Sequence, residues 1–293
     1  MRKSLDEDGN IVYSLGILSN EDSTSIPIDL LLESDSLVLK KRISLFEYIP
    51  LYKEISSSYK HYEIENIPII QVNSLSRIKA SDNSIDDFIN DSKVLRGKDT
   101  IVIDLRGNIG GNMINIEKWY EEFFGTKLRK DIVESGLYTN TSIDLSRHKF
   151  ESKENEPDNV KDDCLEIISQ YESQKYFPGW SPIEYADFKP MDNKTNIFVL
   201  MDKKTSSASE FLIYYLKKLD NVTLIGTNSN GCMLTGNCNS AVLPNSNIPI
   251  YISHKIYISK DFQNIDGLGI LPDLWVKPEE SLDRIIKYIK KVS

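Results

Sequence analysis

Four short segments of this chain are almost uninterrupted runs of apolar residues, and three of them are followed by a segment whose apolar residues recur with helical spacing. Runs of this kind are typical of strands that are buried on both faces, as in a parallel sheet covered by helices. The alternation of such strands with helices predicts a layered α/β core. The expected strands are 67–72, 100–105, 196–201 and 222–226, and the expected helices are 85–95, 112–124 and 207–219.

The segments outside these runs have a different pattern of apolar and polar residues. Residues 1–60 alternate short apolar runs with Ser, Asp, Asn and Pro, which predicts a small β-rich region ahead of an α/β core over 61–293. A polar stretch at about 128–194 is predicted to be an insertion on the surface. After a turn rich in Gly and Asn, the chain is expected to continue as antiparallel β-structure and to close with an amphipathic helix.

Composition excludes several classes of protein. The chain has 293 residues, of which 40% are hydrophobic, and its net charge is -9. An acidic balance disfavours a phosphate backbone as a partner, so nucleic-acid binding is not expected. No uncharged apolar run approaches the ~20 residues that span a bilayer, so no transmembrane segment is expected. The first ten residues lack the apolar region of a signal peptide, so none is expected in this form.

Cysteines and histidines give no support for a metal or cofactor site, and none is predicted. The cysteines lack the CxxC spacing of a zinc site, although Cys232 and Cys238 are close enough in sequence to close one loop by a disulfide. The histidines are far apart in sequence. The three cysteines are Cys164, Cys232 and Cys238, and the three histidines are His61, His148 and His254.

Three motifs carry the residue types of a catalytic site: DLRGNIGG (104–111), KTSSASE (204–210) and IDGLGILPD (265–273). Each has an ordinary structural interpretation when it is taken alone. The first is a glycine turn at the end of a strand, the second a Ser-x-x-Glu capping box at a helix start, and the third a loop with Pro-Asp. Three such motifs in a fixed order are far more specific than any one of them.

In this order and spacing the motifs resemble those of the S41 family of serine peptidases, which includes the tail-specific or C-terminal processing proteases and the tricorn relatives. The resemblance covers about residues 61–277. It implies a layered α/β core of the crotonase or ClpP type that hydrolyses peptide bonds without a cofactor. The implied partner is a polypeptide substrate or its C-terminal end. Family members usually work outside the cytoplasm, so an extracytoplasmic or secreted location is expected.

The motif alignment places the nucleophile at Ser207, two residues before Ser209. A serine at a strand-to-helix turn presents its hydroxyl to solvent, and the unpaired N–H groups at the helix N-terminus favour a developing anion. By resemblance, the N–H groups of Gly111 and Ala208 form the oxyanion hole. Glycine at 110 and 111 allows the main chain to approach the substrate carbonyl, so Gly110 is included in the expected site.

The general base is where this sequence departs from the family. Tail-specific members carry a lysine in a Gly-Lys-Gly turn, and the matching turn here is Gly231-Cys232-Met233. Cys232 does not replace the lysine by simple substitution, because a thiol in a nonpolar turn is mostly protonated.

The tricorn-like branch of the family uses a histidine that a downstream acid orients, and Asp266 is close to where that branch has its glutamate. In that branch the histidine comes from a helical region ahead of the first β-rich part. This chain begins in what resembles the middle of that part, so truncation of the N-terminal region is one interpretation. None of the three histidines falls in a matching motif. His61 is the candidate base because it enters a core strand from the N-terminal side.

Three classes of function follow. The first is a serine endopeptidase that is acylated at Ser207. The second is a family member without a base that binds peptide or an apolar ligand without cleaving it, as the architecture of interphotoreceptor retinoid-binding protein illustrates for apolar ligands. The third is a crotonase-like acyl-CoA enzyme, against which the SSASE turn argues. The identity of the base discriminates between the first two, and the oligomeric state is not predicted.

Overall fold

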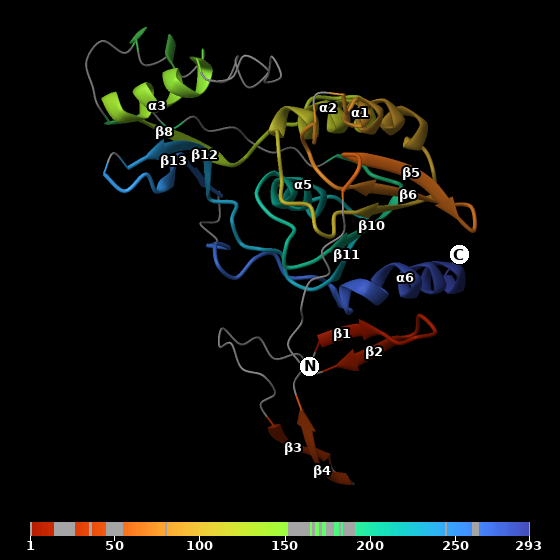
Figure 1. Ribbon diagram of the computed structural model, residues 1–293. Helices are drawn as coiled ribbons and strands as arrows, with labels where there is room; N and C mark the ends of the chain where they lie inside the picture. Colours follow the sequence, from red (N-terminus) through yellow and green to blue (C-terminus); the bar gives the residue numbers. More distant parts are fainter. Residues whose placement is uncertain are drawn as a thin grey trace.

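The core of the molecule is a six-stranded sheet with the strand order β14-β11-β10-β7-β6-β5 (Figure 1). Five of these strands run parallel, and β5 pairs antiparallel with β6 at one edge. The strands are β5 (Tyr59–Ile64), β6 (Ile67–Val72), β7 (Thr100–Asp104), β10 (Asn196–Met201), β11 (Val222–Gly226) and β14 (Leu274–Trp275). The structure is a computed structural model. It describes residues 2–14, 27–34, 37–44, 55–79, 81–151, 165, 168–169, 172–173, 179–181, 183, 191–243, 245–259 and 264–292.

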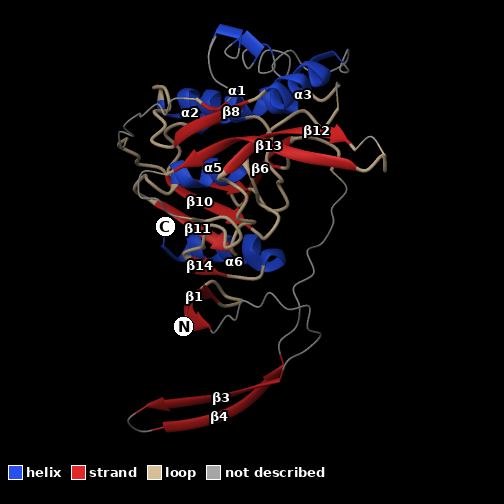
Figure 2. Ribbon diagram, turned by 90° about the vertical axis from the view of Figure 1, so that its left-hand side faces the viewer, coloured by secondary structure: helices blue, strands red, loops and turns tan. Residues whose placement is uncertain are grey.

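Successive side chains of the parallel strands are buried on opposite faces of this sheet. On β7, Ile101 and Ile103 belong to one buried cluster, and Val102 belongs to another. Of the helices that the structure describes, three pack on the first face and one on the second. Figures 1 and 2 show helices on both sides of the sheet. Both faces of the sheet are therefore covered and shielded from water, which explains the nearly continuous apolar runs. This arrangement confirms the predicted layered core. The first face carries α1 (Ser84–Leu95), α2 (Met113–Phe124) and α5 (Ala208–Leu216), and the second carries α6 (Pro278–Val292).

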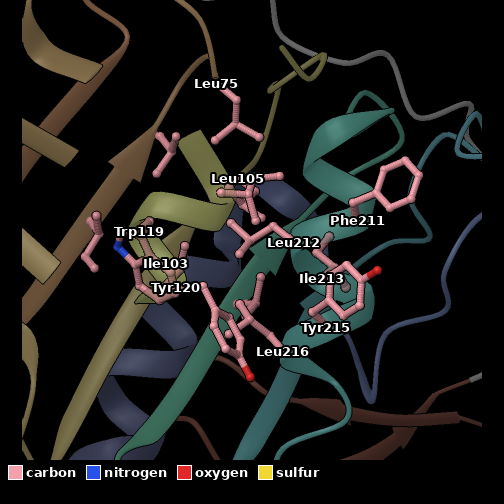
Figure 3. Close-up of a cluster of buried hydrophobic side chains, with 14 of the residues drawn as sticks. Leu75, Ile103, Leu105, Trp119, Tyr120, Phe211, Leu212, Ile213, Tyr215 and Leu216 are labelled. Atoms are coloured by element: carbon pink, nitrogen blue, oxygen red, sulfur yellow. The ribbon is translucent and has the colours of Figure 1, made fainter. Parts of the chain in front are cut away.

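An aromatic cluster holds α1 and α2 together on the first face. Trp119 of α2 stacks on Phe88 of α1 with ring centroids 5.7 Å apart, and on Phe123 at 4.9 Å. Pairs with this geometry contribute about 0.5–1.5 kcal/mol beyond their buried area. Figure 3 shows the same core continuing from Trp119 and Tyr120 to Leu212 of α5. The helix that follows the second motif is thus packed firmly against the sheet.

A second sheet, with the order β12-β13-β8-β9, is antiparallel throughout. It contacts α5 through Tyr257, whose ring meets Phe211 edge to face at 5.0 Å. The stretch at 128–194 holds more regular structure than its polar composition predicts, because β8 pairs with β13 and α3 follows β8. The elements are β8 (Val133–Tyr138), α3 (Asn140–Glu151), β9 (Gly179–Trp180), β12 (Thr235–Val242) and β13 (Pro249–Ile258).

The N-terminal region contains two hairpins, in agreement with the predicted β-rich character. The first hairpin joins the core, because Leu5 is fully buried in the cluster beneath α6 and its carbonyl accepts a hydrogen bond from Arg284. None of the helices that the structure describes is both long and apolar enough to cross a bilayer. The hairpins consist of β1 (Arg2–Leu5) with β2 (Ile11–Ser14), and β3 (Pro27–Ser34) with β4 (Leu37–Ser44).

Candidate active site

The first two motifs meet at the carboxyl ends of two adjacent parallel strands, β7 and β10. Hydrogen bonds fasten the turns that follow these strands to each other. The amide of Ser206 donates to the carbonyl of Asn108 at 3.0 Å, and the Thr205 hydroxyl donates to the carbonyl of Leu105 at 2.9 Å. The carboxyl ends of parallel strands are the usual position for a site in an α/β sheet.

Ser207 is the residue that caps the N-terminus of α5, and its backbone is unusual. Its φ is 54° and its ψ is −122°, whereas an N-cap residue normally has an extended backbone. Such a conformation is uncommon for a residue other than glycine and costs about 1–3 kcal/mol. A sharp turn of this kind between strand and helix lifts a serine hydroxyl out of the chain path, as in nucleophile elbows. The side chain is half-buried.

Gly110 of the first motif packs directly against Ser207. A Cβ on Gly110 would lie 2.9 Å from the Cβ of Ser207 and 2.9 Å from the carbonyl oxygen of Ser206. A Cβ on Gly111 would lie 2.5 Å from the carbonyl carbon of Leu75. Both glycines also have positive φ, 104° and 142°. The two positions require glycine because of close approach and backbone conformation together.

Two backbone amides beside Ser207, those of Gly111 and Ala208, have no hydrogen-bond acceptor among the residues that the structure describes. The carbonyl of Gly110 and the amide of Asn112 both bond to the backbone of Leu75, at 2.9 and 3.1 Å, and the amide of Gly110 donates to the Asn108 side chain. Among the described residues, no acceptor bonds to the N–H of Gly111 or to that of Ala208. Ala208 is the first residue of α5, where intrahelical partners are lacking. These are the two donors that the sequence predicts for an oxyanion hole.

The other polar residues of the first motif shape the turn. Asn108 donates through Nδ2 to the carbonyl of Val72 at 2.9 Å. Arg106 forms a bidentate pair with Asp104, at 2.8 and 2.6 Å, and also donates to the carbonyl of Pro278 at the start of α6. This contact with the Asp104 carboxylate raises the pKa of Arg106 despite its burial. These side chains hold the glycine turn in place.

Glu210 is a residue whose importance goes beyond its role in the capping box. Its carboxylate is fully buried and accepts the Ser207 amide at 3.0 Å, completing one half of the box. It also accepts the Ser229 hydroxyl at 2.5 Å and the amides of Gly231 and Cys232 at 2.7 and 2.9 Å. The sequence signals for Glu210 are the Ser-x-x-Glu spacing and its place at the end of the second motif, and neither reveals the last three contacts.

Cys232, at the position where tail-specific relatives have a lysine, carries a free thiol. Burial raises the pKa of this thiol, and the carboxylates of Glu210 and Asp266 raise it further. The thiol is therefore protonated at neutral pH. Cys238 is also free, so the disulfide considered from the sequence is not present. Its Sγ lies 3.0 Å from the Ser253 hydroxyl on β13.

Asp266 of the third motif is fastened to the segment that follows Cys232. Its Oδ1 accepts the amides of Met233 and Leu234 at 3.1 and 3.0 Å. The neighbouring Gly267 donates its amide to the carbonyl of Gly231 at 2.8 Å. Hydrogen bonds thus connect the third motif, through this turn and Glu210, to Ser207.

His61 does not meet Ser207. It lies on the edge strand β5, separated from β10 by β6 and β7, and its Nδ1 is 3.0 Å from Asp91 of α1. The Tyr59 hydroxyl donates to the same Asp91 oxygen at 2.9 Å. His254 is buried on β13, and His148 belongs to α3, where its side chain lies outside the described part. Among the described side chains, no histidine forms a hydrogen bond with Ser207.

Comparison with known proteins places these motifs within one family. The family model described as peptidase family S41 matches residues 66–276, a range that includes all three motifs. A comparison with curated proteins finds no match.

Several solved structures are similar to this chain. A lipoprotein from Streptococcus agalactiae is 18% identical, with 80% of this chain and 70% of that one covered and a TM-score of 0.46. A photosystem II D1 C-terminal processing protease is 15% identical, with coverages of 89% and 59% and a TM-score of 0.44. Mature CPAF complexed with lactacystin is 12% identical, with coverages of 92% and 67% and a TM-score of 0.48. The chain thus spans between 59% and 70% of the length of these proteins.

Proposed function

The chain belongs to peptidase family S41, and we propose that it carries an acyl-transfer site in which Ser207 is the nucleophile and the amides of Gly111 and Ala208 bind the oxyanion. A single observation supports this assignment most strongly. Ser207 has the positive φ of a nucleophile elbow, and it packs directly against Gly110, beside two amides that have no acceptor among the described residues. A serine that only capped its helix would not need this backbone.

The chemistry follows from this arrangement. The Ser207 oxygen attacks the carbonyl carbon of a peptide bond, and the carbonyl oxygen takes up negative charge. The two amides donate to that oxygen, and the N-terminus of α5 adds its positive dipole end. Donors that are already oriented cost no reorganisation during the reaction, and losing one costs on the order of 100- to 1000-fold in rate.

The proton of the Ser207 hydroxyl needs an acceptor, and neither Cys232 nor His61 fits this role. The Cys232 thiol is protonated at neutral pH, since burial and two carboxylates raise its pKa. His61 bonds to Asp91 and is not proposed as the base. Asp266 is proposed as the acid that would orient a histidine, because it borders the Cys232 turn. Without a base, only binding and the oxyanion hole accelerate the reaction, so we expect slow hydrolysis.

Peptidase family membership implies a polypeptide as substrate. Recognition of a C-terminal end and a location outside the cytoplasm are further proposals. The replacement of the family lysine by Cys232 also favours a second candidate function, in which the chain binds peptide without cleaving it. The two candidates share the same site and differ only in whether Ser207 reacts.

Digestion of an unfolded protein separates the two candidates. Reduced, unfolded casein is incubated with the purified chain and with Ser207→Ala, and new peptides are identified by mass spectrometry. Hydrolysis predicts slow formation of peptides by the native chain and none by the variant. Equal casein binding by both proteins, with no product that depends on Ser207, would instead support binding without cleavage.

A further inference from the structure

We propose that the hydroxyl of Ser76 is a third hydrogen-bond donor to the substrate carbonyl, beside the amide of Gly111; this inference rests on the proposed function of Ser207. Ser76 lies in the segment after β6, outside all three sequence motifs. A side chain of this type is one of those that supply oxyanion donors in enzymes.

Ser76 lies beside the glycine turn of the first motif. Leu75 forms a parallel bridge with Gly111, which brings the segment after β6 alongside the glycine turn. The Oγ of Ser76 lies 2.8 Å from the place that a Cβ on Gly111 would occupy. The hydroxyl therefore rests against the Cα of Gly111, the residue whose amide is a proposed oxyanion donor.

Within the described part of the chain, the Ser76 hydroxyl is also free to donate a hydrogen bond to a substrate, whereas the main-chain groups of Ser76 already have partners. The Ser76 amide donates to Ser74 Oγ at 3.1 Å, and its carbonyl accepts from the hydroxyls of Ser74 and Ser58 at 2.8 and 2.6 Å. By contrast, within the ranges that the structure describes, the Ser76 hydroxyl itself has no hydrogen-bond partner. Ser76 is half-buried, so the residue is not closed off from solvent.

The main chain around Ser76 is held rigidly, which an oxyanion donor requires. Asp82, only 6% exposed, accepts the amides of Ser58, Ile78 and Ser84 at 2.9, 3.2 and 3.1 Å. Burial alone would raise the pKa of Asp82, but the hydroxyls of Ser58 and Ser84, which also donate to this carboxylate, and the nearby amides lower it, so it stays ionised at neutral pH. Ser58, anchored in this way, holds the carbonyl of Ser76. The main chain that carries the hydroxyl is therefore preorganised, and the side-chain torsion of Ser76 is the one remaining freedom of this donor.

The test measures acylation and stability in parallel. A fluorophosphonate reacts at Ser207 by forming an oxygen–phosphorus bond with loss of fluoride, and at pH 9 solvent hydroxide takes the hydroxyl proton. The second-order labelling rate and the urea midpoint are measured for the native chain, Ser76→Ala, Ser76→Thr and Ser81→Ala. Ser81 is an exposed serine nearby and provides the matched control.

The proposal predicts that Ser76→Ala slows labelling by about 100-fold with an unchanged urea midpoint. Ser76→Thr, which keeps the hydroxyl, restores much of the rate, and Ser81→Ala labels like the native chain. Labelling of Ser76→Ala at the native rate overturns the proposal and leaves Ser207 as the nucleophile. A loss of rate that parallels a lowered midpoint, without rescue by threonine, also overturns it. Failure of the native chain to label at Ser207 overturns the proposed function as well.

Discussion

The amides of Ser207 and Cys232 donate hydrogen bonds to the same carboxylate oxygen, Oε2 of Glu210, at 3.0 and 2.9 Å. The turn in which tail-specific relatives carry their lysine is thereby held against the N-terminus of the helix that begins after Ser207. A side chain at position 232 therefore starts from a main chain that shares a hydrogen-bond acceptor with Ser207, the proposed nucleophile. Under the proposed function, a basic side chain at this position could therefore reach the Ser207 hydroxyl.

We predict that Cys232→Lys increases the rate of Ser207-dependent hydrolysis. A lysine acts as a base only in its neutral form, and the two carboxylates that raise the pKa of Cys232 will also favour the charged form of a lysine there. The gain should therefore appear mainly at alkaline pH. The measurement is the pH–rate profile of peptide hydrolysis, with Cys238→Lys on β12 as the control.

Adding Asp266→Asn to Cys232→Lys should move this profile toward lower pH. Removal of a negative charge disfavours the protonated lysine, so its pKa falls and the neutral base becomes available earlier. A profile that does not move, or that moves to higher pH, would show that the Asp266 carboxylate does not act on position 232.

Glu210→Gln should both destabilise the protein and abolish acylation. The buried carboxylate accepts three amides and a hydroxyl, and an amide side chain would turn an NH₂ group toward some of these donors. We expect the free energy of unfolding to fall by about 3 kcal/mol. Urea denaturation and serine labelling measure the two effects. Glu121→Gln, on the exposed side of α2, is the control, and equal stability of the two variants would contradict the account.

Gly110→Ala tests the contact between the glycine turn and the nucleophile. The new methyl group would collide with Ser206 and Ser207 at 2.9 Å, so the labelling rate should fall about 100-fold, as misplacement by an ångström can cost. Gly107→Ala is the matched control, because its φ is also positive, 79°, but a Cβ there meets nothing within 4 Å. Equal labelling rates in the two variants would separate Gly110 from the site.

Asp82→Asn should lower the free energy of unfolding by about 1–3 kcal/mol at pH 7. Hydrogen bonds lower the pKa of Asp82 in the folded state, so its contribution is present above the ordinary aspartate pKa of about 4 and is lost as the pH falls below it. The stability difference between the native chain and the variant should therefore shrink between pH 5 and about pH 2. Urea denaturation at several pH values measures this, with Asp86→Asn, an exposed ion-pair residue, as control. A difference that grows as the pH falls would contradict it.

The sequence predicts the parts of this fold that depend on local pattern. The runs at 67–72, 100–105, 196–201 and 222–226 became β6, β7, β10 and β11, because strands buried on both faces need continuous apolar residues. The strand β14 has only two residues, too few to produce a recognisable pattern. Its pairing depends on β11, which is distant in sequence.

In the candidate site, too, local pattern predicts some residues and long-range packing determines others. The motifs place Ser207 at a helix start and Gly110 beside it, since both follow from strand–turn–helix patterns. The contacts of Glu210 with Ser229 and of Asp266 with Met233 join residues 19 and 33 positions apart, and no local pattern encodes them. His61 illustrates the limit, because its partner Asp91 is set by how α1 packs on β5.

Peptide mapping after treatment with a fluorophosphonate at pH 9 tests the central claim, that Ser207 is the nucleophile. The account predicts an adduct on Ser207 in the native chain, in Ser206→Ala and in Ser209→Ala, and no adduct at this peptide in Ser207→Ala. Ser209 is fully buried, so it should not react. An adduct on Ser206 or Ser209, or a native chain that stays unmodified under these conditions, would contradict the account.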